Sequence, residues 1–237
     1  ARNPQWQDEN VRKAFLYGID RQSIVDDIYQ GSAVVAPCAD PYDTYWPADA
    51  DPYAYDPEKA KQLLADANFD TSVEYEMPTY YTGQLANDVM QAFQAYLSEI
   101  GIKTVPRFME PAAWRAIVEG DLNYDLAYRG MGAGPAEFPD RFYVPDLYPT
   151  LEGGYYGIDD AELTGLITAM NATTNFEDYK AARTAVCSYM NKTALQPFMW
   201  VGTRYGLARD GLQDFYYFPA PGGGPYLDHA ETWSVAK

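Results

Sequence analysis

The sequence has almost no histidine, and this excludes several kinds of catalytic site. Its single histidine, His229, lies near the end of the 237 residues. Serine–histidine–aspartate triads and zinc sites with two histidine ligands are therefore excluded, and no serine stands in a Gly-x-Ser-x-Gly motif. We expect no catalytic residue, no metal site and no cofactor in this chain.

Cysteine is scarce as well, with Cys38 and Cys187 as the two thiols. They lie far apart in the sequence and form no Cys-x-x-Cys motif, which argues against a zinc or redox site. A disulfide and a pair of unbonded buried thiols are both compatible with the sequence, because it does not give the distance between the two residues in space.

Basic residues are few, since 17 lysines and arginines accompany 34 acids and leave a net charge of −17. Such a surface repels nucleic acids and anionic membranes, so neither is expected as a partner. No apolar run approaches the roughly 20 residues of a membrane span. The acids are dispersed without EF-hand spacing, and we interpret them as a solubilising surface.

The composition is typical of a globular protein, with 47% hydrophobic residues and 22 tyrosines. Residues 8–31 and 53–69 each carry clear signals for the starts and ends of helices. The predicted caps are, in order, Asp8 or Glu9, Asp20, Gly31, Asp56 before Pro57, and Asn68.

The middle of the chain alternates between strand-like and helix-like periods. The predicted strands span 73–77, 102–108, 125–129 and 198–203, and helices at 83–100 and 114–119 connect the first three. This order predicts an α/β fold with a mixed, mostly parallel sheet flanked by helices.

Two further helices are expected after a long segment, 130–157, that is rich in glycine, proline and tyrosine. Asp159 with Glu162 and Thr174 with Glu177 have the spacing of helix starts. Residues 219–237 are expected to form a loop or tail. A long segment without helical or strand periodicity inside a compact domain is usually functional or faces a ligand. We therefore expect 130–157 to contribute to ligand binding.

Two loops that leave predicted strand ends are the candidate binding site. The first, 79–83, carries paired tyrosines, and the second, 129–135, is rich in glycine, which lets a ligand approach the backbone. The candidate ligand-binding residues are Tyr80, Tyr81, Arg129, Met131, Gly134 and Glu137. For the two tyrosines, covering a core edge is an equal alternative. Arg129 is expected either to pair with a structural acid such as Asp125 or Asp140, which we favour, or to stay ready for the carboxylate of a ligand.

Several stretches together resemble a known family. They are DENVRKAFLYGIDRQSIV (8–25), YAYDPEKAKQLLADA (53–67), LSEIGI (97–102) and GDLNYDLAYRG (120–130). In this order they are similar to the later part of the extracellular solute-binding proteins of the peptide/nickel class, family 5, which serve ABC importers.

The resemblance implies a lobe of the type II periplasmic-binding-protein kind, with residues 1–237 as the C-terminal lobe of a two-lobed protein. It also implies capture of a peptide or peptide-like solute outside the cell or in the periplasm, and delivery to ABC permease subunits. A cell-surface lipoprotein is compatible with this, with any membrane anchor lying outside this chain.

Two departures from the family pattern narrow the range of ligands that this chain is expected to bind. Peptide-binding members carry a Trp-x-x-Asp step whose aspartate pairs the ligand's amino terminus, whereas Met131 and Gly134 stand at these positions here. Dipeptide-binding members have an arginine in the earlier loop, where this chain has TYYTGQ. Free-amine dipeptides are therefore disfavoured, because a buried ammonium group needs a counter-charge. Blocked or longer peptides and oligosaccharides stay possible as ligands.

Two other functions are alternatives to solute capture. An enzyme of the glycoside hydrolase class would use Glu137 and Asp140 as its pair of carboxylates. A sensor or adhesin built on the same lobe is the third possibility.

Overall fold

The computed structural model describes residues 3–130, 138, 140, 143–144, 158, 160–203, 209–214 and 234–235. Its α-helices are α1 (Glu9–Gly18), α2 (Arg21–Ser23), α3 (Pro57–Asp66), α4 (Gln84–Glu99), α5 (Pro111–Arg115), α6 (Ala161–Asn171) and α7 (Phe176–Lys192). Short 3-10 or π-type turns are η1 (Pro4–Gln7), η2 (Ile24–Ile28), η3 (Asp43–Tyr45) and η4 (Ala116–Gly120). The strands are β1 (Ala33–Val35), β2 (Glu74–Thr79), β3 (Lys103–Phe108), β4 (Trp200–Gly202), β5 (Leu212–Gln213) and β6 (Ser234–Val235).

Most of the predicted helix caps are confirmed. The Asp8 carboxylate accepts from the N–H of Asn10 at the start of α1, and Asp20 caps α2 in the same way. Asp56 caps α3, which begins with Pro57. Gly31 and Asn68 adopt positive φ angles of 72° and 51°, as expected of residues that end helices. The short polar side chains therefore determine where these helices begin.

The predicted parallel pairing is present between β2 and β3, which α4 connects. The described strands nevertheless pair two by two, since β1–β4 and β5–β6 form separate antiparallel sheets. Pro78 and Pro106 lie within β2 and β3, and a proline cannot donate a hydrogen bond to a further strand. The α/β arrangement is correct, but the expected single sheet is divided.

The predicted strand at 125–129 is wrong as a regular strand. The N–H of Tyr128 donates to the carbonyl of Pro78 at 3.0 Å, so this segment does lie beside β2. Pro78 has no N–H to donate in return, and a ladder does not form. The segment still delivers Tyr128 and Arg129 to the carboxyl end of β2.

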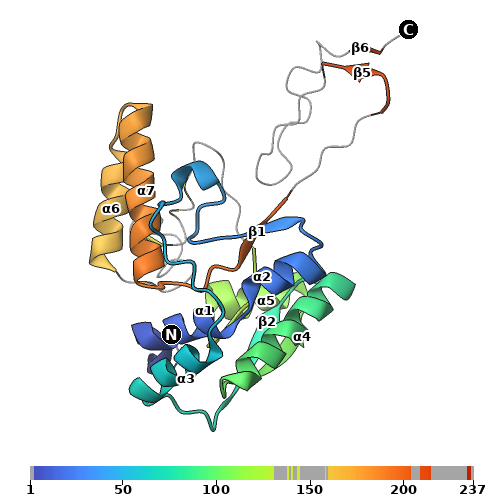
Figure 1. Cartoon of the computed structure of the whole chain (residues 1–237), viewed down its shortest axis with the longest axis vertical. Coiled ribbons are helices and arrows are strands. Elements are labelled where there is room, and N and C mark those ends of the chain that lie inside the picture. The colour runs from blue at the N-terminus through green and yellow to red at the C-terminus, as the bar shows by residue number, and fades with distance from the viewer. Residues whose placement is uncertain are drawn as a thin grey trace.

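Two hydrophobic clusters stabilise the fold. The main core lies between α1, α3, α4 and β2 and contains Trp6, Phe15, Tyr75, Phe93 and Leu97 among others. The second core lies beneath α6 and α7, which stand side by side in Figure 1, and contains Cys38, Tyr143, Leu163, Ile167 and Val186 among others.

The last two helices form as expected, with small shifts at their starts. Asp160 caps α6 and Asn175 caps α7, so the start predicted from Thr174 is wrong by one residue, and Asp159 lies outside the described residues. Of the segment 219–237, which is expected to form a loop or tail, the described part is β6, and it pairs with β5.

Candidate functional site

A cavity of about 1570 Å³ that opens to solvent lies between the two cores. Its lining comes from segments that are far apart in the sequence. They include the loop after β2 and the segment 126–130, the first half of α4, residues 195–203 around β4, and part of the segment 36–42. The cavity is thus built where the parallel strands end, the position at which open α/β folds bind ligands.

Among the six predicted ligand-binding residues, Tyr81 and Arg129 line this cavity. Tyr80 packs instead against the buried Trp114, with 4.9 Å between the ring centroids. This contact agrees with the alternative that Tyr80 covers a core edge. Met131, Gly134 and Glu137 lie outside the described residues.

The two predicted loops are bonded to each other through Tyr81. Its hydroxyl accepts a 2.7 Å hydrogen bond from the N–H of Gly130, and burial raises the pKa of this phenol to about 12. A Cβ atom on Gly130 would lie 2.5 Å from the same oxygen. A side chain at position 130 would therefore displace the Tyr81 hydroxyl from this hydrogen bond.

Arg129 pairs with a structural acid, as expected. Its guanidinium donates to Glu119 of η4 at 2.5 Å and lies over the Trp114 ring, 5.2 Å from the centroid. The sequence suggested Asp125 or Asp140 as examples of such an acid, and the acid found is Glu119, which η4 brings to the arginine from ten residues earlier in the chain. The pairing fixes the position of the cation at the cavity wall.

Four aromatic side chains that the sequence did not single out as site residues form one surface of the cavity. This ring floor consists of Tyr29, Phe93, Tyr128 and Trp200. The centroid distances are 5.1 Å between Tyr29 and Trp200, 5.3 Å between Phe93 and Tyr128, and 5.8 Å between Phe93 and Trp200. The residues come from four separate segments of the chain.

Arg21 holds the cavity wall together without an acidic partner in the described residues. Its guanidinium donates to the carbonyls of Ala36, Phe198, Pro52 and Tyr53. Burial lowers the pKa of Arg21 to about 10, and the group still carries its charge at neutral pH. Three separate segments of the chain are thereby bonded to one side chain.

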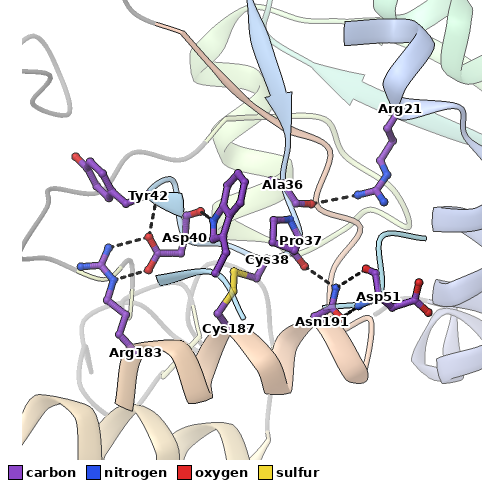
Figure 2. The surroundings of a disulfide bond; sticks show 11 residues. Arg21, Ala36, Pro37, Cys38, Asp40, Tyr42, Asp51, Arg183, Cys187 and Asn191 are labelled. Carbon is purple, nitrogen blue, oxygen red and sulfur yellow. Dashed lines mark hydrogen bonds and ion pairs between the residues drawn. A yellow bond between two sulfur atoms is a disulfide. The ribbon is translucent and has the colours of Figure 1, made fainter. Parts of the chain in front are cut away.

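A disulfide joins the segment after β1 to α7 (Figure 2). Cys38 and Cys187 are bonded, with 5.4 Å between their Cα atoms, and this answers the question that the sequence left open. Beside it, the guanidinium of Arg183 forms a two-pronged ion pair with the Asp40 carboxylate. Both side chains are completely buried. Asp51 and Pro37 are tied to Asn191 of α7 in the same region.

Metal binding and membrane insertion find no support within the described ranges. No group of three or more histidine, cysteine, aspartate or glutamate side chains comes together there in a way that could hold a metal ion. No helix in that part of the chain is both long enough and apolar enough to cross a membrane.

Comparisons with known proteins agree with the resemblance seen in the sequence. The family described as bacterial extracellular solute-binding proteins, family 5, middle part, matches residues 1–150. A Brucella melitensis protein, provisionally named an ABC transporter peptide-binding protein, is 35% identical over 99% of this chain and 46% of its own length.

Solved structures confirm the fold class, a lobe of the type II periplasmic-binding-protein kind. The Bacillus subtilis oligopeptide-binding protein AppA, in complex with a nonapeptide, has a TM-score of 0.77 at 21% identity and covers 99% of this chain and 49% of its own. A Thermotoga maritima periplasmic oligopeptide-binding protein with bound mannohexaose has a TM-score of 0.68 at 19% identity, over 83% of this chain and 42% of its own. The present chain therefore spans about half the length of its relatives.

Proposed function

Because this chain belongs to the bacterial extracellular solute-binding proteins of family 5, we propose that the whole protein captures a peptide or peptide-like solute for ABC-type import. The observation that carries this proposal is the open cavity at the carboxyl end of β2, with Tyr81 and Arg129 in its wall. The cavity is larger than the roughly 300–1000 Å³ of pockets for small molecules, which favours a ligand of several residues.

Residues 1–237 are then the C-terminal lobe of a two-lobed protein. A ligand held between two lobes selects the closed arrangement through its contacts to both of them, by a hinge motion. The closed form would deliver the solute to ABC permease subunits. The family description supports a location outside the cell membrane, and a lipid anchor would belong to a part of the protein outside this chain.

The binding residues we propose for this lobe are those at the carboxyl end of β2. Tyr81 and Arg129 are supported by their place in the cavity wall. Tyr80 contacts the Tyr81 ring, with 4.8 Å between the ring centroids. Met131, Gly134 and Glu137 follow Gly130 in the sequence and stay predictions. With Gly134 in place of the family's aspartate, blocked or longer peptides fit this lobe better than free-amine dipeptides.

An oligosaccharide is the second candidate ligand. The aromatic cavity surface supports it, since flat amphipathic rings suit sugars as well as peptides. The Thermotoga relative with mannohexaose is a further argument. We propose binding rather than catalysis in either case, because the matched family consists of solute-binding proteins. The described acid of the alternative hydrolase pair, Asp140, accepts a hydrogen bond from Asn171.

A ligand screen by thermal shift on the full-length protein tests this proposal. We expect blocked and longer peptides to raise the melting temperature, because a ligand at 100 times its Kd stabilises the native state by about 2.7 kcal/mol. Arg129→Ala should weaken the binding of the best peptide about tenfold, since it removes the charged side chain that the cavity wall presents beside Tyr81. The control Arg115→Ala changes an exposed residue of α5 outside the cavity and should have no effect.

Two results would contradict this account. If only oligosaccharides raise the melting temperature, the ligand is a sugar and the proposal of a peptide ligand is wrong. Full affinity in the folded Arg129→Ala variant would remove Arg129 from the site and leave Tyr81 and the aromatic surface as the remaining candidates.

A further inference from the structure

We propose that the ring floor (Tyr29, Phe93, Tyr128 and Trp200) is a specificity subsite that takes an uncharged aromatic or aliphatic side chain of the ligand. This inference rests on the proposed function and adds the chemical class of side chain that the lobe prefers. All four rings line the cavity, and Tyr81, a predicted binding residue, adjoins the floor with 5.6 Å between its ring centroid and that of Tyr128.

The rings are arranged to receive another flat or branched apolar group. Phe93 is almost fully buried, whereas Tyr29, Tyr128 and Trp200 keep part of their surface accessible. The Phe93 and Trp200 rings are stacked at 26°, and Tyr128 meets Phe93 edge to face at 79°. This mosaic of ring faces and edges gives a side chain several favourable orientations. Leu85, Ala86 and Val89 of α4 extend the apolar lining beside the floor.

The polar groups of the floor are few and neutral. The hydroxyls of Tyr29 and Tyr128 lie 3.5 Å apart and form a weak hydrogen bond with each other. Burial raises the pKa of Tyr128 above its ordinary value of 10.0, so the phenol stays neutral. The hydroxyl pair can donate to or accept from a ligand amide, but it cannot compensate a charge.

The charged residues of the described lining interact with groups that are not part of the floor. Arg129 is held by Glu119, and Arg12 donates to backbone carbonyls that include that of Ala194. Asp160 accepts from the N–H of Leu163 and from the hydroxyl of Tyr189.

The fourth charged lining residue, Asp125, has one carboxylate oxygen that is buried without a hydrogen bond. Burial and, after it, the charge of Asp125 raise the pKa of Tyr75, which belongs to the main core and not to the floor. In the described part of the chain, the cations that lie over rings do so at Tyr17, Trp114 and the rings around Arg183, not at the floor. A lysine or glutamate side chain on the floor would therefore lose its water while facing only the neutral rings and hydroxyls of the floor.

Affinities of the full-length protein for a series of blocked pentapeptides test the subsite. The probes are acetyl-Gly-Gly-X-Gly-Gly-amide peptides in which X is Phe, Leu, Ala, Lys or Glu. We expect the Phe and Leu peptides to bind at least about tenfold more tightly than the Ala peptide, as is usual for filling an apolar pocket, and the Lys and Glu peptides to bind no better than Ala.

In Trp200→Leu, the preference for Phe over Ala should fall to about twofold while the affinity for the Ala peptide is retained. Tyr29→Leu gives a second route to the same result if β4 does not tolerate the loss of Trp200. The control Phe176→Leu changes an aromatic side chain that is 61% exposed and lies outside the cavity, and it should leave the preference unchanged.

The outcomes separate the subsite from the proposed function. If the peptides bind without preference at X, or if the preference survives both floor variants, peptide capture stands and the subsite is wrong. The first of these results is also the one expected if another part of the full-length protein fills the floor. If no peptide of the series or of the wider screen binds, the proposed function fails, and this inference fails with it.

Discussion

Replacing Arg183 with methionine is expected to lower the free energy of unfolding by about 3–5 kcal/mol, because the change leaves a buried carboxylate without its partner. Asp40 and Arg183 are both completely buried, and the guanidinium also donates to the Tyr179 hydroxyl at 3.1 Å. The Tyr45 ring lies under the cation, 4.0 Å from its central carbon. Urea unfolding of the oxidised chain, followed by circular dichroism, measures the effect.

Two controls separate the buried charge from a general loss of packing. Asp40→Asn combined with Arg183→Met removes both charges and should recover more than half of the loss. Arg107→Met breaks an exposed ion pair with Glu76 and should cost less than about 1 kcal/mol. If the single variant Arg183→Met has the same free energy of unfolding as the wild type, the ion pair does not stabilise the fold.

The same variant has a defined pH dependence. Burial already raises the pKa of Asp40 above its ordinary value of 3.8, against the opposing effect of Arg183. Without the arginine the pKa should rise further, so the folded state binds a proton that the unfolded state releases. A group with a raised pKa in the folded state favours folding at low pH. The deficit of Arg183→Met should therefore be full at pH 8 and shrink as the pH falls toward 4.

Loss of the disulfide is expected to have a comparable effect. The bond closes a loop with a sequence separation of 149 residues, and the chain-entropy relation gives about 5 kcal/mol as its upper contribution, with 2–5 kcal/mol typical of such losses. Replacing both Cys38 and Cys187 with alanine should lower the free energy of unfolding by that amount. Urea unfolding without reductant measures the difference.

Unfolding in the presence of reductant is the matched control for this variant. Both cysteines are nearly or fully buried, so a reductant reaches the bond mainly after unfolding. The wild type should then unfold at the urea concentration of the double variant, whereas the variant itself should not change. A double variant within about 1 kcal/mol of the oxidised wild type would contradict the role of the bond as a stabilising link.

The sequence predicts well what neighbouring residues decide. Asp8, Asp20 and Asp56 cap helices through N–H groups two or three positions away, and such contacts leave a signature in the order of residues. The parallel pair β2–β3 follows from the helix between its strands. These elements bring Tyr81 and Arg129 to the cavity wall.

What the sequence does not reveal depends on distant contacts. Asp40 and Arg183 are 143 positions apart, and in a chain with a net charge of −17 a single acid reads as part of the solvated surface. The ring floor could not be predicted for the same reason, because its four residues come from four separate segments of the chain. The failed strand at 125–129 has a different cause, because a proline in the neighbouring strand, Pro78, removes the donor for a ladder.

Hydrogen exchange on the full-length protein, with and without a bound peptide, tests most directly whether this lobe supplies the ligand site. With a nonapeptide or the best peptide of the screen, we predict slower amide exchange at 81–86, 126–130 and 199–203, segments that contribute residues to the cavity lining. Exchange in α3 at 57–66, which lies outside the cavity, should be unchanged. Tight peptide binding that leaves exchange at all three cavity segments unchanged would contradict the account.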